Sequence, residues 1–276
     1  MLFDFHTHAF VDAIAERAMA SLLNTTKNNK ETEHMKAYTD GTISGLRLLM
    51  QEKGVSKSLL LPIATKPSQQ TTINNWAAES MGGGIYSCGT VHPDAENAIE
   101  ELERIKSLGL CGVKLHPEYQ FFRPDEERLF PIYRKCTELG LFAVFHAGWD
   151  PIGKGEILAP PKSFAKIAEK FPEMTIVAAH MGGMRQFDEV EDCLAGKFGN
   201  VYFDTAAVAD YISSEQLFRI ISAHGADKIL FASDEPWDDP LKEVKMIAQL
   251  PLSVDEREWI FHKNGERLLK MSKINN

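Results

Sequence analysis

Short apolar runs recur along the whole chain at broadly even spacing, and this repetition constrains the fold more than any other feature. The runs are almost continuously apolar, as expected of parallel strands that are covered on both faces. Amphipathic segments with the helical period of 3.6 residues lie between them, for example from Ala98 to Leu108. The expected strands are residues 2–5, 58–61, 85–90, 112–115, 142–145, 175–179, 201–204 and 229–232.

Strand and helix alternating eight times is typical of a (β/α)8 barrel, or TIM barrel, an α/β architecture that takes about 250 residues. The chain fits a single domain over residues 1–276, because no linker composition divides it. Residues 24–33 are polar and are expected to form an exposed excursion or lid after the first strand. Pro124 is expected to open a helix that Gly140 ends, and residues 255–273 to form a final helix on the outside of the barrel.

The composition excludes several classes of protein. A content of 44% hydrophobic and 25% charged residues supplies a sizeable core and excludes disorder. The net charge of −9 argues against a nucleic-acid partner, and no stretch approaches the ~20 apolar residues of a membrane helix. The N-terminus lacks the pattern of a secretory signal, so we expect a cytoplasmic protein. We expect its partner to be a small-molecule substrate. A homo-oligomer is left open. Reduced, buried thiols are expected at Cys88, Cys111, Cys136 and Cys193.

Polar residues gather where the expected strands end, which is where the active site of such a barrel lies. Six of the nine histidines stand at or just beyond a strand end, a concentration that scattered structural histidines would not show. Two carboxylates, Asp204 and Asp234, follow the last two expected strands. The six histidines are His6, His8, His92, His116, His146 and His180.

The first expected strand ends in His6-Thr7-His8. Side chains two residues apart on a strand point to the same face, about 6.6 Å apart along the chain. Two imidazoles placed in this way can converge on one ion with metal–nitrogen bonds of about 2.0–2.1 Å. The alternative is a buried, hydrogen-bonded pair, but the other polar strand ends favour a metal site.

His146, His180 and Asp234 each terminate an apolar strand. Either histidine alone is more often a structural residue, and a lone aspartate there often caps the next helix. Beside the His6-x-His8 pair they complete a ligand set. One oxygen of Asp234 can bind the metal while the other takes a proton from water, so this residue is expected to act as ligand and base.

Four blocks follow one another in the order His6-x-His8, Phe145-His146-Ala147-Gly148, Ala179-His180-Met181-Gly182-Gly183 and Ser233-Asp234-Glu235-Pro236. In these blocks the chain resembles the amidohydrolase superfamily, in the branch that also contains aminocarboxymuconate-semialdehyde decarboxylase. The resemblance implies a divalent metal, usually zinc, with His180 beside it to polarise water or substrate. The ligands it implies are His6, His8, His146 and Asp234.

Lys114 ends the fourth expected strand, and two roles are open for it. Some members of the superfamily carry a carboxylated lysine at this place, bridging two metals. His146 and His180 would then hold the second ion. Alternatively, Lys114 stays an ammonium that orients a substrate carboxylate or pairs with an acidic neighbour. One ion is the commoner arrangement in the branch that this chain resembles, and we expect one.

Two further residues are candidates for substrate binding. His116 lies in the loop after the fourth strand, where the alternative is packing of the loop. Arg185 follows Gly182-Gly183, where its guanidinium could meet an anion, or could lie on the surface. Either side chain is expected near the mouth of the barrel.

The function expected first is that of a metal-dependent hydrolase. A water activated by the metal would attack a small, carboxylate-bearing amide, lactone or ester, with Asp234 as base and His180 polarising the carbonyl. The alternative is a non-oxidative decarboxylase, a lyase that uses the same ligands. A phosphodiesterase resembling TatD-type deoxyribonucleases is less favoured, because Lys114 stands where those enzymes have a glutamate. A barrel that only binds a metabolite is disfavoured, because no ligand has been lost.

Overall fold

The computed structural model describes residues 1–27, 32, 35–151, 153 and 155–273. Half of the expected excursion at residues 24–33 lies outside the described residues, while Asn24 and its successors to Lys27 form the end of helix α1 (Asp12–Lys27). No helix in these ranges is long and apolar enough to cross a membrane.

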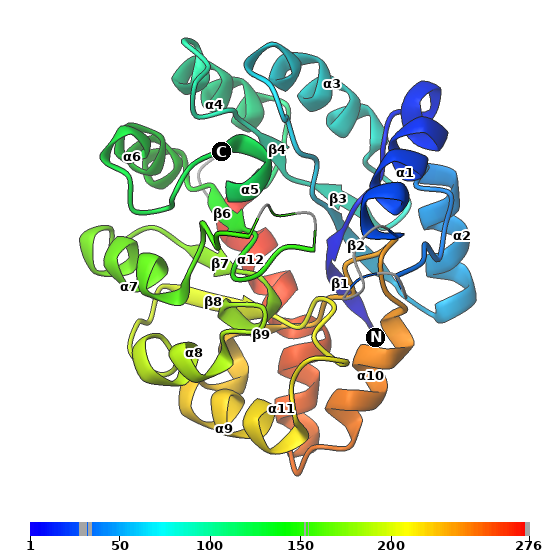
Figure 1. Ribbon diagram of the computed structural model, residues 1–276, viewed down its shortest axis with the longest axis vertical. Helices are drawn as coiled ribbons and strands as arrows, with labels where there is room; N and C mark the ends of the chain where they lie inside the picture. Colours follow the sequence, from blue (N-terminus) through cyan, green and yellow to red (C-terminus); the bar gives the residue numbers. More distant parts are fainter. Residues whose placement is uncertain (28–31, 33–34, 152, 154, 274–276) are drawn as a thin grey trace.

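Parallel strands form the centre of the molecule and helices surround them (Figure 1). The strands lie where the sequence predicts them, because each is a buried apolar run. One sheet has the order β1-β2-β3 and the other the order β4-β5-β6-β7-β8-β9. The strands are β1 (Phe3–Thr7), β2 (Lys57–Leu60), β3 (Ile85–Ser87), β4 (Gly89–Thr90), β5 (Gly112–Leu115), β6 (Phe142–Phe145), β7 (Ile176–Ala178), β8 (Val201–Asp204) and β9 (Ile229–Leu230).

Backbone hydrogen bonds join the two sheets on both sides. β3 and β4 are the two halves of one expected strand, and Cys88 between them still donates its N–H to the carbonyl of Leu60 at 3.0 Å. At the other side, the N–H of Phe5 donates to the carbonyl of Phe231 at 2.8 Å. With β3 and β4 counted as one, the eight strands form the expected (β/α)8 barrel.

Helices cover the outer faces of the strands and pack on them through a large apolar core. Pro124 does not open a helix as expected; its carbonyl accepts a hydrogen bond from the Tyr133 hydroxyl, and the helix begins after the turn at Glu127–Leu129. The helices after α1 are α2 (Ile43–Lys53), α3 (Gln70–Ser80), α4 (Ala98–Ser107), α5 (Pro117–Gln120), α6 (Phe130–Leu139), α7 (Pro161–Lys170), α8 (Phe187–Cys193), α9 (Ser214–His224), α10 (Pro240–Ala248), α11 (Val254–Glu258) and α12 (Asn264–Lys273).

The C-terminal helices differ from the expectation in where they pack. The segment expected to be one helix consists of α11, a π-helical turn at Trp259–Lys263, and α12. α12 inserts Leu268 and Leu269 into the apolar cluster inside the barrel and so covers its N-terminal end (Figure 1). We call this cluster the apolar layer: Phe3, Phe5, Leu59, Leu61, Cys88, Cys111, Phe142, Val144, Val177, Tyr202, Leu230, Leu268 and Leu269.

Candidate metal centre

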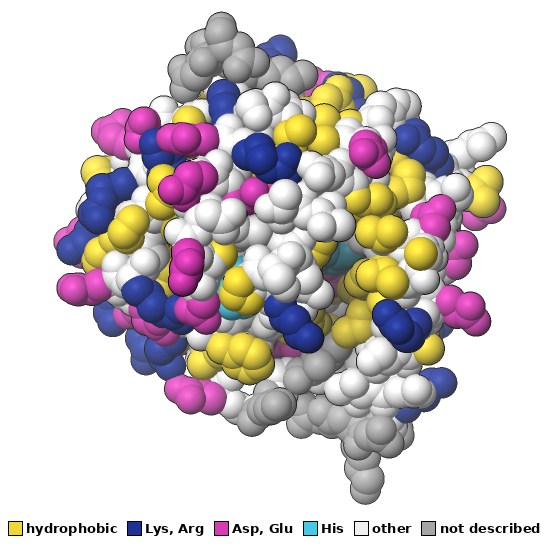
Figure 2. Space-filling model, turned by 90° about the horizontal axis from the view of Figure 1, so that it is seen from above, with side chains coloured by type: hydrophobic (Ala, Val, Ile, Leu, Met, Phe, Trp, Pro, Cys, Tyr) yellow, Lys and Arg dark blue, Asp and Glu magenta, His cyan; other side chains and the backbone are white. Residues whose placement is uncertain are grey.

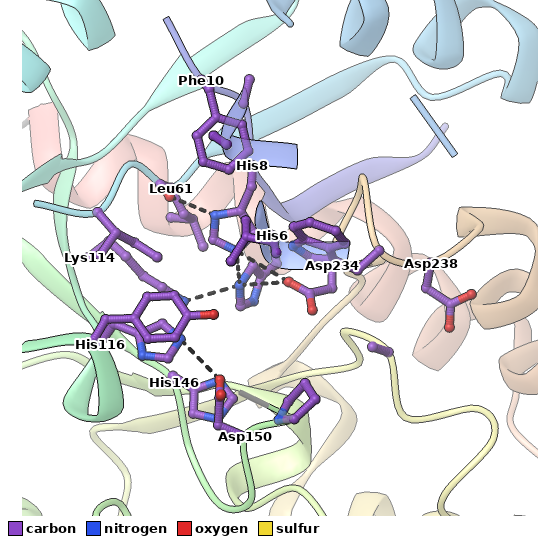
Figure 3. Close-up of a pocket in the computed structure, with 18 of the residues that line it drawn as sticks. His6, His8, Phe10, Leu61, Lys114, His116, His146, Asp150, Asp234 and Asp238 are labelled. Carbon is purple, nitrogen blue, oxygen red and sulfur yellow. Dashed lines mark hydrogen bonds and ion pairs between the residues drawn. The ribbon is translucent and has the colours of Figure 1, made fainter. Parts of the chain in front are cut away.

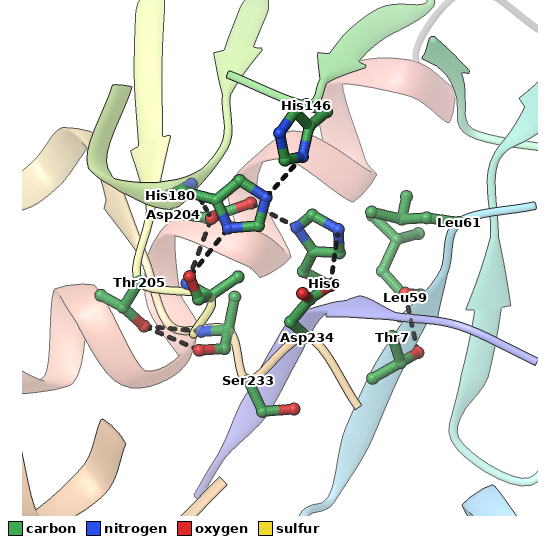
Figure 4. Close-up of polar contacts among 12 residues, drawn as sticks. His6, Thr7, Leu59, Leu61, His146, His180, Asp204, Thr205, Ser233 and Asp234 are labelled. Carbon is green, nitrogen blue, oxygen red and sulfur yellow. Dashed lines mark hydrogen bonds and ion pairs between the residues drawn. The ribbon is translucent and has the colours of Figure 1, made fainter. Parts of the chain in front are cut away.

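The opposite end of the barrel interior is polar. Side chains two residues apart on a strand share a face, so β6 presents Phe142 and Val144 to the apolar layer and places His146 directly after its end. In the same way, Tyr202 of β8 is followed on its face by Asp204. We call the residues that meet there the polar cluster (Figure 3 and Figure 4): His6, His8, Lys114, His116, His146, Asp150, His180, Asp204 and Asp234.

Three of the expected ligands form a compact triangle. His6 Nε2 lies 3.1 Å from His8 Nε2 and 3.3 Å from Asp234 Oδ1, and His8 Nε2 lies 3.2 Å from the same oxygen. Ligands bonded to a tetrahedral ion at about 2.0–2.1 Å lie about 3.3 Å from one another. The three atoms therefore fit a small divalent ion with tetrahedral coordination.

The Nδ1 hydrogen bonds of the His6 and His8 imidazoles leave the lone pair of each Nε2 for a metal. His6 Nδ1 lies 2.9 Å from Asp204 Oδ2, and His8 Nδ1 lies 2.8 Å from the carbonyl oxygen of Leu61. These oxygens can only accept, so each Nδ1 carries the proton and each Nε2 offers its lone pair. Burial and the adjacent Lys114 lower the pKa of His6 well below its usual range, which keeps the ring neutral.

Asp204 has a larger role than its place at the end of a strand indicated. One of its oxygens accepts from His6, and the other accepts from the backbone N–H of His180 at 2.8 Å (Figure 4). The carboxylate thus orients two site histidines at once. Its position at the end of β8 was the available signal, but the chain alone does not show which histidines it meets.

His146 lies beside the triangle. His180 contacts both neighbours: its ring centroid is 5.2 Å from that of His6, and its Nε2 is 3.0 Å from Nδ1 of His146 (Figure 4). The Nδ1 of His180 lies 2.8 Å from the carbonyl of Ala206, so this nitrogen carries the proton. The structure therefore brings His6, His8 and Asp234 together directly, and it links His146 to them through His180.

A second group of potential ligands surrounds His146. Nε2 of His116 lies 3.5 Å from Asp150 Oδ2, and Nε2 of His146 lies 3.8 Å from the same oxygen. The two rings stack with centroids 4.5 Å apart. Asp150 was not singled out in the sequence, because it follows the strand end by five residues within a loop. It supplies a buried acceptor to the side of His146 that faces away from His180.

Lys114 is completely buried, and its Nζ lies 3.1 Å from His6 Nε2. Burial lowers the pKa of this ammonium to about 8, although Asp234 and Asp204 oppose the shift. The side chain therefore reaches the proposed ligand atom itself, so both roles expected for it are within its range.

The other candidates divide between the pocket and its surroundings. His116 lines a pocket of about 590 Å³ above the polar cluster and stacks on Tyr119 at 3.8 Å. Arg185 is not among the described residues that line this pocket; its guanidinium packs over Trp149 at 3.7 Å, behind the wall. Its contact is thus with an aromatic ring that does line the pocket. His92 is also outside the lining and accepts a hydrogen bond from the N–H of Asp94.

Two residues of the site adopt a backbone conformation that side chains disfavour. His180 and Asp234 both have positive φ values, of 57° and 72°. Such residues are uncommon outside glycine, and they cluster at functional sites where the surrounding structure holds them. The N–H of Asp234 donates to the carbonyl of His6 at 2.9 Å, which fixes the carboxylate beside the first strand.

Comparisons with known proteins identify the family and the fold. Among curated proteins, the chain is 29% identical over 110 residues to 2-amino-3-carboxymuconate-6-semialdehyde decarboxylase from Dictyostelium discoideum; the match spans 33% of this chain and only 30% of that relative. An uncharacterized TIM-barrel protein from Bordetella bronchiseptica is similar with a TM-score of 0.80 and 17% identity, covering 99% of each chain.

Two decarboxylases have a similar fold. One is a 5-carboxyvanillate decarboxylase from Sphingomonas paucimobilis, with a TM-score of 0.72, 18% identity and 98% of each chain covered. The other is a 5-carboxyvanillate decarboxylase from Novosphingobium aromaticivorans with bound manganese, with a TM-score of 0.72, 16% identity, and 98% and 97% covered. At such identities the likeness shows the fold. A family model described as amidohydrolase matches residues 3–271, and the chain therefore belongs to the amidohydrolase family.

Proposed function

We propose that this chain is a metal-dependent, non-oxidative decarboxylase of an aromatic or enoic carboxylic acid. The observation that carries the proposal is the decarboxylase relative within the matched amidohydrolase family. This replaces hydrolysis, our first expectation, by the alternative that stood beside it. We also propose that residues 1–276 act as one catalytic domain in the cytoplasm.

The proposed metal site consists of His6, His8 and Asp234, with His146 as the further ligand that the family resemblance implies. A divalent ion there would supply positive charge for the electron pair that remains when carbon dioxide departs. The triangle of donors suits zinc, and manganese in a related fold makes it the second candidate. We propose one ion per chain.

The other residues of the polar cluster would bind and orient the acid. Lys114, His116 and His180 line the pocket, and Lys114 as an ammonium would attract a carboxylate. Decarboxylation breaks the bond between the carboxylate and its carbon, and that carbon then takes a proton. A water in the pocket would supply this proton, and His180, whose Nε2 carries a lone pair, is proposed to orient that water, while Asp204 holds the His180 backbone in place.

Hydrolysis is the second candidate, and one observation favours it. Oδ1 of Asp234 lies 3.3 Å from His6 Nε2 and 3.2 Å from His8 Nε2, and the residue lines the pocket, so its second oxygen would be left to accept a proton from water. A hydrolase needs that proton to be handed to a leaving oxygen or nitrogen. A decarboxylase needs a proton only on carbon.

The experiment that separates the two is a substrate screen of aromatic and enoic acids, lactones, esters and amides with separate detection of carbon dioxide. We expect one carbon dioxide released per acid consumed, and no turnover of neutral amides or lactones. Turnover of a lactone, ester or amide without carbon dioxide, suppressed in Asp234→Asn, would establish the hydrolase instead.

A further inference from the structure

Helix α1 has two apolar faces, and the described residues cover only one of them. Ala15 and Met19 are buried, and Met19 lies against Gly41, where a side chain would come within 2.7 Å of its sulfur. The second face lines the pocket and follows the helical spacing of three, four and four residues. Its apolar residues are Ile14, Ala18 and Leu22 of the helix and Val11 just before it, and Ser21 and Thr26 of the helix also line the pocket.

The wall that shares the pocket with this face is also apolar. Ile63 follows β2, and Ile73 and Trp76 belong to α3. Phe10 and Leu61 lie between this region and His8 (Figure 3). The pocket therefore has a polar floor made by the polar cluster and an apolar upper part between α1 and α3.

The exposure of the pocket residues supports a ligand rather than a collapsed core. Ile14 is 42% exposed although it lines the pocket, so this side chain is available to contact a ligand. The rim is polar, because Lys242 binds Asp210 and Asp238 there. Figure 2 shows histidine at the bottom of a depression that is bordered by hydrophobic side chains.

We propose that the substrate is an amphipathic acid whose carboxylate lies at the polar cluster and whose apolar body extends along the pocket-facing side of α1. The reaction of this acid rests on the proposed function, whereas its binding in the pocket does not. A volume of about 590 Å³ is in the range of about 300–1,000 Å³ that holds drug-sized ligands. A single-ring acid would leave the apolar upper part unfilled.

The test measures binding of 4-alkylbenzoates, from methyl to hexyl, to the metal-loaded protein by titration calorimetry. Burying each added methylene should tighten binding about fourfold. The affinity should rise along the series until the alkyl chain passes Ile14 and reaches the rim. An affinity that is independent of chain length would overturn the proposal.

Two variants locate the effect. Ile14→Ser should flatten the dependence on chain length and leave the affinity for 4-methylbenzoate unchanged. Leu48→Ser is the matched control, because Leu48 is 61% exposed on α2 and does not line the pocket. An Ile14→Ser protein that keeps the full dependence would contradict the placement of the apolar body on α1. Trp76→Ala should weaken binding of the longer acids by about tenfold or more.

The result is distinguishable from that of the proposed function. If affinity grows with chain length but no acid releases carbon dioxide, the apolar site stands and the decarboxylase proposal fails. If small acids release carbon dioxide and chain length has no effect, the decarboxylase stands and the apolar site is wrong.

Discussion

The two ends of the barrel interior are built from the same strands but differ in what holds them together. In the apolar layer, Phe5 packs on Phe142 with ring centroids 5.6 Å apart, and α12 covers the end. In the polar cluster, His6 is held between Asp204 at 2.9 Å and Lys114 at 3.1 Å. Phe5 and His6 are neighbours on β1, yet Phe5 packs in the apolar layer and His6 belongs to the polar cluster.

A local irregularity makes this division on β1. The pairing of β1 with β2 shifts register between Asp4 and Thr7, where three steps on one strand face two on the other. Such shifts re-aim side chains and are common beside active sites. The difference between the two ends teaches that stability and chemistry are separable here, because one layer is apolar and the other is a set of directed polar contacts.

The substitution with the largest expected effect, His6→Ala, disrupts the polar cluster alone. His6→Ala removes a proposed ligand, and losing the several kcal/mol that an ion supplies corresponds to about 10³-fold or more in rate. The proposed decarboxylation and the metal content should both collapse, while circular dichroism stays unchanged. A variant that keeps a full ion and its activity would show that His6 is not a ligand.

The substitution with the next largest expected effect disrupts the apolar layer alone. Phe142→Ala should lower the free energy of unfolding by about 3–5 kcal/mol, because it leaves a cavity beside Phe5. Urea unfolding measures this loss, and the folded variant should bind as much metal as the parent. Phe121→Ala is the control, since Phe121 is 68% exposed and should change stability little. Loss of metal at unchanged stability in Phe142→Ala would argue against two separable ends.

A smaller effect concerns the support of the ligands. Asp204→Asn keeps the size of the side chain but removes the charge that fixes the tautomer of His6. Changes to such supporting carboxylates typically cost about 10–100-fold in metal affinity. Competition with a chelator measures this. Asp192→Asn, at an exposed position, is the control and should leave the affinity unchanged. Equal affinities in both variants would remove Asp204 from the site.

The smallest expected effect is a pH dependence of stability caused by a histidine outside the apolar layer and the polar cluster. His224 stacks on Phe203 with centroids 3.9 Å apart, and burial lowers its pKa to about 4. In the unfolded chain the ring takes a proton near pH 6.5, whereas the folded protein resists it, so stability is lost as the pH falls. The loss should reach about 2 kcal/mol at pH 5 relative to pH 7.5.

Unfolding of His224→Gln at several pH values tests this assignment. The variant should lack that part of the pH dependence and keep its metal. A variant with the parent's pH dependence would mean that other groups cause it.

The barrel was predictable because its signals are local. Gly112–Leu115, Phe142–Phe145 and Val201–Asp204 are bounded as the apolar runs indicated. The packing of α12 was not, because Leu268 and Leu269 fit an outer surface as well as the barrel end, and only the three-dimensional structure decides between them.

The site was predictable in its residues more than in its contacts. His6 and His8 meet as their spacing indicated. Asp204 and Asp150 act across the barrel, on residues far from them in the chain, and spacing carries no information on such pairs. The pocket-facing side of α1 was also hidden, because an apolar stripe in a sequence does not reveal whether protein or ligand covers it.

The most direct test of this account is the metal content of protein purified without chelator. Elemental analysis should find one divalent ion per chain, and none in His6→Ala. Protein that releases carbon dioxide from its acid while holding no ion, and that loses nothing on dialysis against chelator, would contradict the claim that the polar end of the barrel is a metal centre.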